Sequence, residues 1–166
     1  MASGDTLFKF IPQSNEPPAA NFATADTRNT TSPHPLLDFA IGEIAIFSGV
    51  MPRNYAGGGV TIYLHYGMSS AVADDIKLET DFERIGDQQQ DIDSDGFTGS
   101  PQNTGDITVP GTSGLVDIVT TAHANGAEMD SIAAGEGFRL QVKRVAVTGD
   151  DASGDLELRF VEGKET

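Results

Sequence analysis

Hydrophobic and polar residues alternate along two long segments of the chain, residues 60–66 and 76–85. In VTIYLHY, every second residue from Val60 is apolar or aromatic, and in IKLETDFERI the positions facing one way carry mainly Lys, Asp and Glu. A period of two residues is that of a β-strand whose two faces meet different surroundings. Two such strands need a second sheet to cover their apolar faces, so the pattern predicts a two-layer protein.

Shorter segments with a strand-like pattern follow one another through the rest of the chain, separated by links rich in Gly, Pro, Asp and Asn. They are residues 36–48, 107–109, 115–122, 138–147 and 156–160. One helical turn is plausible, in residues 126–134. About eight short strands with almost no helix predict an all-β fold, an antiparallel β-sandwich of the single jelly-roll type.

The final strand has a simple predicted orientation. Leu156, Leu158 and Phe160 are expected on one face, with Glu157 and Arg159 on the other. The apolar set would then face the core.

The first 35 residues differ in composition from the remainder. Residues 12–35 hold five of the eight prolines, and proline disfavours helix both at its own position and at the one before it. We therefore expect residues 1–35 to form an extended arm beside a compact domain of residues 36–166. A flexible terminus is the alternative, but a solvated tail has little use for apolar residues. The arm is expected to dock on a partner surface, such as a neighbouring subunit, through Leu7, Phe8, Phe10, Ile11 and Phe22.

Charge and composition exclude several classes of function. The chain has 25 acidic and 10 basic residues, a net charge of −15, and no cysteine. Nucleic-acid affinity depends mainly on Lys and Arg, so a nucleic-acid partner is not expected. The first residues lack a basic region followed by an apolar core, and no apolar run is long enough to span a bilayer. We expect a soluble protein made in the cytoplasm, with no membrane partner.

A cluster of acidic residues begins like a calcium-binding loop. Asp91, Asp93, Asp95 and Gly96 provide the oxygen ligands and the turn that such a loop needs. The twelfth position is Gln102 instead of a bidentate Glu, and no helix is predicted on either side. An acidic surface loop is therefore favoured over a calcium site, and no metal site is predicted.

No catalytic constellation is evident. Carboxylates between Asp74 and Asp95 could act as the pair that cleaves a glycoside, but acids that alternate along a strand usually form its solvent face. His34, His65 and His123 lack the spacing of a zinc site, and no nucleophile elbow is present. We expect no enzyme activity and no cofactor. The candidates for stacking on sugars or partner proteins are Tyr55, Tyr63 and Tyr66.

Several short motifs resemble a group of structural proteins of tailed bacteriophages. The matching pieces are Leu64-His65-Tyr66, FERIGD at 82–87, DID at 91–93 and AGEGFRLQVKR at 134–144. Tyr66 stands where Trp is more usual in that group. The resemblance covers roughly residues 45–147 and brings no enzymatic motif with it.

The resemblance implies a capsid decoration, or cement, protein. Such a protein would be a homotrimeric jelly roll on the virion surface, made in the host cytoplasm and bound to the major capsid protein. The N-terminal residues Leu7, Phe8, Phe10, Ile11 and Phe22 would then be the ones that contact the capsid. The alternative is a receptor-binding or tail-fibre module that recognises host surface glycans. A trimer would fit either function, so oligomeric state does not separate them.

Overall fold

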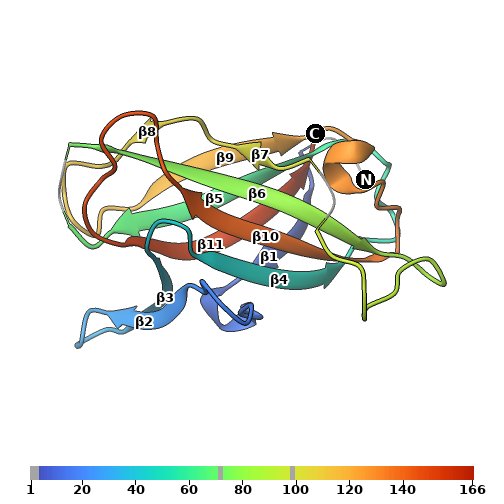
Figure 1. Cartoon of the computed structure of the whole chain (residues 1–166), viewed down its shortest axis with the longest axis horizontal. Helices are drawn as coiled ribbons and strands as arrows, with labels where there is room; N and C mark the ends of the chain where they lie inside the picture. The colour runs from blue at the N-terminus through green and yellow to red at the C-terminus, as the bar shows by residue number, and fades with distance from the viewer. Residues whose placement is uncertain (1–3, 71–72, 98–99) are drawn as a thin grey trace.

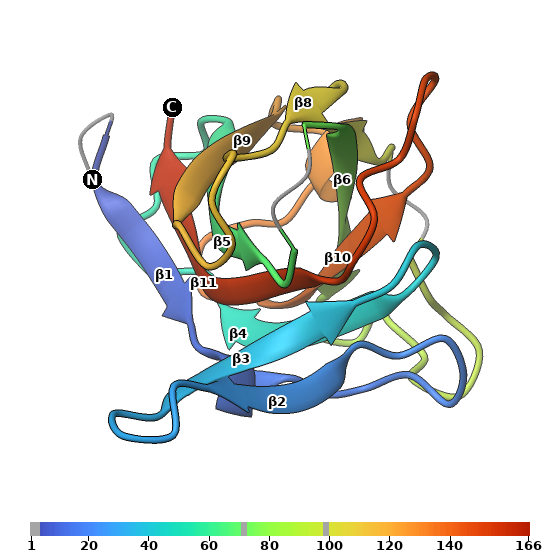
Figure 2. The ribbon, with the colours of Figure 1, turned by 90° about the vertical axis from the view of Figure 1, so that its left-hand side faces the viewer.

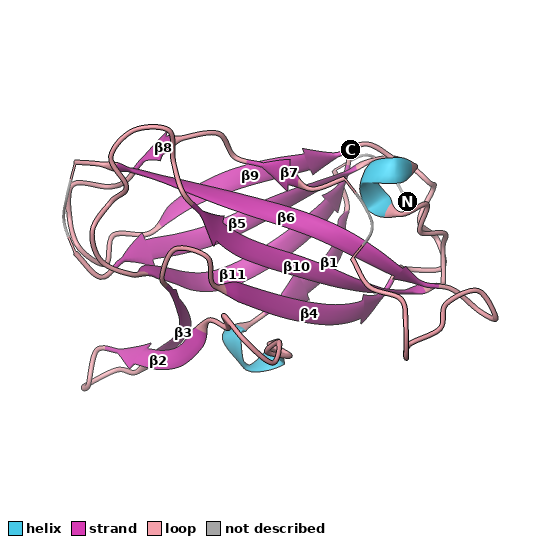
Figure 3. Ribbon diagram, viewed as in Figure 1, coloured by secondary structure: helices cyan, strands magenta, loops and turns pink. Residues whose placement is uncertain are grey.

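The computed structural model describes residues 4–70, 73–97 and 100–166. Within these residues the chain forms eleven strands and two short 3-10 helices, and no α-helix (Figure 3). The 3-10 helices are η1 (Pro12–Ser14) and η2 (Ala127–Met129). In the described part of the chain, no helix is long and apolar enough to cross a membrane.

The strands form two antiparallel sheets packed face to face (Figure 1), which confirms the predicted sandwich. The six-stranded sheet contains β1 (Thr6–Phe10), β2 (Thr24–Arg28), β3 (His34–Phe39), β5 (Val60–Met68), β9 (Asp117–His123) and β11 (Leu156–Glu165). The five-stranded sheet contains β4 (Ile44–Val50), β6 (Asp75–Ile85), β7 (Gln102–Asn103), β8 (Ile107–Thr108) and β10 (Gly137–Val145).

The core lies between the sheets and follows the predicted alternation. Val60, Ile62, Leu64 and Tyr66 of β5 are fully buried, as are Ile76, Leu78 and Phe82 of β6 and Phe138, Leu140 and Val142 of β10. The residues between them on β5 and β10 are half-buried, as expected for strands with one face in the core.

The structure differs from the sequence expectation at the N-terminus. Residues 6–10 do not extend away from the domain but form β1, which pairs with β11 from Thr6↔Lys164 to Phe10↔Val161. Leu7 and Phe10 are buried in the core, and the ring of Phe8 lies 4.9 Å from that of Phe138 between centroids. The segment is extended, as predicted, but it is a strand of the sandwich, with Phe10 buried and Phe8 partly buried.

Strand β11 holds the six-stranded sheet together. It pairs along its whole length with β5, while its other edge pairs first with β3, through Leu156–Leu158, and then with β1 (Figure 2). A β-bulge between Leu158 and Phe160 interrupts the ladder with β5 where β3 ends and β1 begins. A bulge adds one residue to a strand and so changes which side chains face the core after it.

The bulge overturns the predicted orientation of the last strand. Leu156, Leu158 and Val161 are buried, whereas Phe160 is 41% exposed. Phe160 therefore lies on the outer face of the sheet, and Val161 takes the core position beyond the bulge.

A buried arginine fixes one end of the sandwich. The side chain of Arg144 in β10 is 1% exposed and donates hydrogen bonds to the carbonyl oxygens of Phe39 at 3.0 Å, Gly154 at 2.8 Å and Ala152 at 2.7 Å. These bonds tie β10 to the end of β3 and to the loop that leads into β11. Burial lowers the pKa of Arg144 from its ordinary value.

Candidate functional site

The motifs that resemble phage proteins pair with one another inside the fold. Arg84 of β6 donates from Nε to Oε2 of Glu136 at 2.7 Å, just before β10 begins. In the same two strands Arg139 donates from Nε to Oε2 of Glu83 at 2.5 Å. The hydrogen bonds from Arg84 lower the pKa of Glu136. These motif residues thus join β6 to β10 and explain the fold better than they identify a partner.

The acidic loop at residues 91–95 satisfies its own backbone. Oδ2 of Asp95 accepts the N–H of Asp91 at 2.8 Å, and Oδ1 of Asp91 accepts the N–H of Asp93 at 3.0 Å. In the part of the chain that the structure describes, no group of three or more His, Asp or Glu side chains is placed to hold a metal ion.

The predicted aromatic candidates separate into buried and surface residues. Tyr55 and Tyr66 are buried, and the hydroxyl of Tyr66 donates to Oδ2 of Asp117 at 3.2 Å. Tyr63 and His65 are half-buried on the outer face of β5. Of these residues, only Tyr63 and His65 are placed to meet a ligand.

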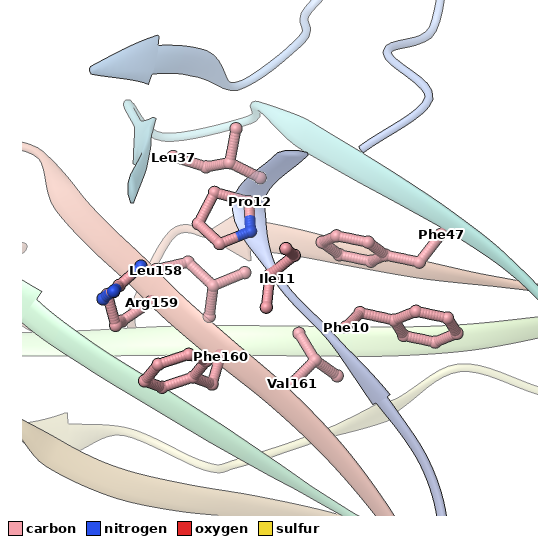
Figure 4. Close-up of a pocket in the computed structure, with 9 residues that line it drawn as sticks. All are labelled: Phe10, Ile11, Pro12, Leu37, Phe47, Leu158, Arg159, Phe160 and Val161. Atoms are coloured by element: carbon pink, nitrogen blue, oxygen red, sulfur yellow. The ribbon is translucent and has the colours of Figure 1, made fainter. Parts of the chain in front are cut away.

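The predicted contact residues of the N-terminal segment also separate. Leu7 and Phe10 are buried in the protein's own core, and Phe8 is partly buried against it. Ile11 and Phe22 are exposed, at 47% and 45%. Figure 4 shows Phe10 and Phe47 beside each other and, on β11, Arg159 and Phe160.

The bulge in β11 gathers a surface cluster that the sequence did not predict. Phe160 lies opposite His65 of β5, which in turn lies opposite Ile118 of β9. The rings of Phe160 and His65 meet edge to face, 5.9 Å apart between centroids. The guanidinium carbon of Arg159 lies 4.6 Å from the centroid of the Phe160 ring. We call Arg159, Phe160, His65 and Ile118 the bulge cluster.

Two hollows flank the bulge cluster on this outer face. The larger, about 490 Å³, is lined by Arg28, Asn29, His34, Leu36, Gly67, Gly114, Val116, Glu157 and Arg159. The smaller, about 310 Å³, is lined by Lys9, Phe10, Ile11, His65, Phe160, Val161 and Glu162. Arg159 lines the first hollow and Phe160 the second, so these two neighbouring residues of β11 lie between the hollows.

A set of hydrogen bonds shapes one wall of the larger hollow. Arg28 donates from Nε to Oε1 of Glu157 at 2.6 Å and from Nη1 to Oγ of Ser113 at 3.2 Å. From Nη2 it also donates to the carbonyl oxygen of Met68, at 3.2 Å. Glu157 is 5% exposed, so the charge of Arg28 compensates a nearly buried carboxylate.

A second carboxyl lies beside this ion pair. Asp38 of β3 lies directly opposite Glu157 of β11. Burial, followed by the nearby carboxylates of Asp26 and Glu157, raises the pKa of Asp38 from 3.8 to about 6. Asp38 does not line the hollow, and one of its oxygens is buried without a hydrogen-bond partner in the described structure.

Arg159 is held differently. Its Nη1 donates to the carbonyl oxygen of Pro35 at 2.6 Å. It forms no ion pair with any residue that the structure describes. Sequence reasoning missed this residue because strict alternation along β11 placed it on an ordinary solvent face, and the bulge leaves no signal in the pattern.

Comparisons with known proteins reveal a likeness of fold only. No family model and no curated protein sequence matches the chain. The structure resembles the C-terminal CBM6 of LamC, a marine laminarinase from Zobellia galactanivorans, with a TM-score of 0.55 and 12% identity over 97% of this chain and 100% of that one.

Two further solved structures are similar. CsCBM6-3 from Clostridium stercorarium, in complex with cellobiose, has a TM-score of 0.53 and 9% identity, over 96% of this chain and 95% of that one. A carbohydrate-binding module CBM36 in complex with calcium and xylotriose has a TM-score of 0.50 and 14% identity, over 95% of this chain and 100% of that one. The protein therefore has the jelly-roll fold that these carbohydrate-binding modules share, as the sequence predicted.

Proposed function

We propose that the protein is a non-catalytic module that binds glycans on the outer face of its six-stranded sheet. The observation that carries the proposal is the open surface around the bulge cluster, where one hollow is lined by Arg159 and the other by the exposed ring of Phe160. The likeness of the whole chain to carbohydrate-binding modules supports the same function.

The surface has the chemistry that sugar recognition needs. A pyranose presents an apolar face, which packs on an aromatic ring, and a rim of hydroxyls, which needs fixed polar partners. Phe160 and Tyr63 supply rings on this face, and Asn29, His34 and Arg159 supply polar groups at the hollow. A hollow of about 490 Å³ lies within the range of small-ligand sites.

The same surface lacks the arrangement of a glycoside hydrolase. Such enzymes use two carboxyl groups on opposite sides of the bond that is cleaved. Among the described residues, Glu157 is the one carboxylate that lines the larger hollow, and it accepts a hydrogen bond from Arg28. Glu162 is the one carboxylate that lines the smaller hollow, and its Oε1 accepts a hydrogen bond from Thr6 at 2.6 Å. Each carboxylate is engaged by a neighbouring side chain, which favours binding over catalysis.

A glycan-binding assay with two site variants tests the proposal. In titrations against a panel of soluble oligosaccharides, Phe160→Ala removes the stacking surface and should weaken binding roughly tenfold. Gly67→Val should weaken binding as well, because its side chain would take up part of the larger hollow, which Gly67 lines. A Cβ at Gly67 meets only ordinary contacts, the nearest being the carbonyl oxygen of Leu115 at 3.5 Å, so the variant should fold.

The control is Val50→Ala, which trims an exposed apolar residue on the other sheet. It should bind like the unmodified protein. Failure of the whole panel to bind would refute the function. Unchanged binding by both site variants would move the site elsewhere.

Capsid decoration is a second candidate, and the motif resemblance over residues 45–147 favours it. It predicts a homotrimer that binds the major capsid protein on the virion surface.

Co-sedimentation with capsids lacking this protein separates the two functions. Saturable binding that is lost in an Ile11→Asp, Phe22→Asp double variant would support decoration, and binding to glycans alone would refute it. If both activities are present, the module would attach a virion to cell-surface glycans.

A further inference from the structure

The outer face of the six-stranded sheet is richer in basic residues than the protein as a whole. Four of the ten basic residues lie along it: Lys9 and Arg28 on β1 and β2, and Arg159 and Lys164 on β11. The chain as a whole carries a net charge of −15. In a strongly acidic protein, a local gathering of cations marks a place where a negative group can be bound.

The acidic residues on the same face are largely engaged. Glu157 accepts a hydrogen bond from Arg28, and Glu162 accepts one from the hydroxyl of Thr6. Asp38 has a pKa raised to about 6 by burial, and Asp26 lies beside it at the far edge of the sheet. None of these carboxylates forms an ion pair with Arg159, Lys9 or Lys164.

Arg159 keeps most of its donors open to a ligand. Arg28 donates from Nε, Nη1 and Nη2 to protein acceptors, whereas among the described residues Arg159 makes one side-chain hydrogen bond, from Nη1 to the carbonyl oxygen of Pro35. The cation–π contact with Phe160 holds the guanidinium in place beside the larger hollow. A planar guanidinium with free N–H groups matches the geometry of a carboxylate or a sulfate.

From this placement we infer that the glycan recognised by the bulge cluster is anionic, with a carboxylate or sulfate group bound by Arg159 while the sugar ring packs on Phe160. His34 also lines the larger hollow and adds a second donor. The inference rests on the proposed function and specifies its substrate class.

Matched pairs of probes test charge apart from sugar type. The carboxylate pair is oligogalacturonate and its full methyl ester, and the sulfate pair is carrageenan oligosaccharides and the same oligosaccharides after chemical desulfation. Affinities of the full chain are measured by titration calorimetry. The anionic member of at least one pair should bind roughly tenfold more tightly than its neutral partner, and the pair that responds identifies the group.

Three variants locate the effect. Arg159→Gln should lose roughly the same tenfold for the anionic probe, and its loss for the neutral probe should be clearly smaller. Arg159→Lys keeps the charge but loses the planar guanidinium, so its affinity for the anionic probe should lie between those of the unmodified protein and Arg159→Gln. Lys143→Gln removes one positive charge from β10, in the other sheet, and should behave like the unmodified protein. Thermal melts confirm that each variant is folded.

Each outcome has one meaning. Equal affinity for the charged and neutral probes would overturn the inference that the ligand is anionic, and so would equal losses of affinity for the anionic probe in Arg159→Gln and Lys143→Gln. Either result would leave the proposed glycan binding intact. Failure of all four probes and of the wider panel overturns both proposals. Sedimentation velocity without ligand tests the competing occupant. If the protein forms an oligomer that Phe160→Ala dissociates, the face is an interface between copies of this chain, and the inference is wrong.

Discussion

Nε2 of His123, in β9 of the six-stranded sheet, lies 2.8 Å from Oγ1 of Thr80, in β6 of the five-stranded sheet. A hydrogen bond between two polar side chains thus joins the two layers through the core. Nδ1 of His123 lies 2.8 Å from the carbonyl oxygen of Glu128, and the ring meets Phe82 edge to face at 4.9 Å. Thr80, Glu128 and Phe82 thus enclose the imidazole between the two sheets.

The burial of His123 predicts a loss of stability in mild acid. Burial lowers its pKa below 6.5 in the folded state, so below pH 6.5 the unfolded chain binds a proton that the folded protein resists. The free energy of unfolding should therefore fall as the pH drops below 6.5, through the window down to the folded pKa. In urea denaturation, the free energy of unfolding of His123→Gln should fall less steeply with decreasing pH than that of the unmodified protein. An identical slope in both proteins would contradict the assignment.

Asp38 predicts a pH dependence of the opposite sign. Its pKa is about 6 in the folded protein, against 3.8 for an ordinary Asp. The folded state holds the proton more tightly, so the contribution to stability is complete below pH 3.8 and is lost as the pH rises through 6. Asp38→Asn removes the charge that burial disfavours. The variant should gain stability at pH 7.5 relative to the unmodified protein and gain little at pH 4. A gain that does not depend on pH would show that Asp38 is not the titrating group.

The position of β1 in the sandwich predicts a clear difference between neighbouring residues. The ring of Phe10 stacks on that of Phe47, with centroids 5.2 Å apart, and is 7% exposed. Phe10→Ala should reduce the free energy of unfolding by about 3–5 kcal/mol. The matched control is Ile11→Ala at an exposed position, which should change it by less than about 0.5 kcal/mol. Small effects from both variants would mean that residues 6–10 are not held in the sheet.

Arg144 predicts a large stability cost for a conservative change. Its guanidinium serves three carbonyl oxygens at once, and a lysine ammonium cannot reach all three in the same geometry. Arg144→Lys should lower the free energy of unfolding by about 3 kcal/mol, because buried carbonyls lose their donor. Lys143→Ala, at the preceding half-buried position, should have little effect. Equal thermal melts for the two variants would refute the structural role of Arg144.

Much of the fold could be read from local pattern. The alternation in residues 60–66 and 76–85 identifies the apolar side chains that the structure buries, but Asp81 and Glu83, which the pattern placed on the solvent face, are buried as well. The predicted turn at 126–134 contains η2, and the acidic residues 91–95 form a surface loop that bonds to its own backbone. These features depend on neighbours a few residues apart, which is the range that a sequence pattern reports.

The candidate site depended on contacts that no local pattern encodes. Phe160 faces outward only because β11 changes pairing partners between β3 and β1 and accommodates the change with a bulge. The N-terminal aromatics lie in the core only because residues 6–10 pair with the last strand of the chain.

The sequence alone therefore determined that the chain is an acidic β-sandwich, because burial of apolar residues imposes a two-residue period on each strand. The tertiary structure decided which strands are neighbours and where the ladder breaks. A one-residue shift in a strand moves every following side chain to the opposite face, so the pairing of β11 set the position of Phe160, and with it the surface around Arg159.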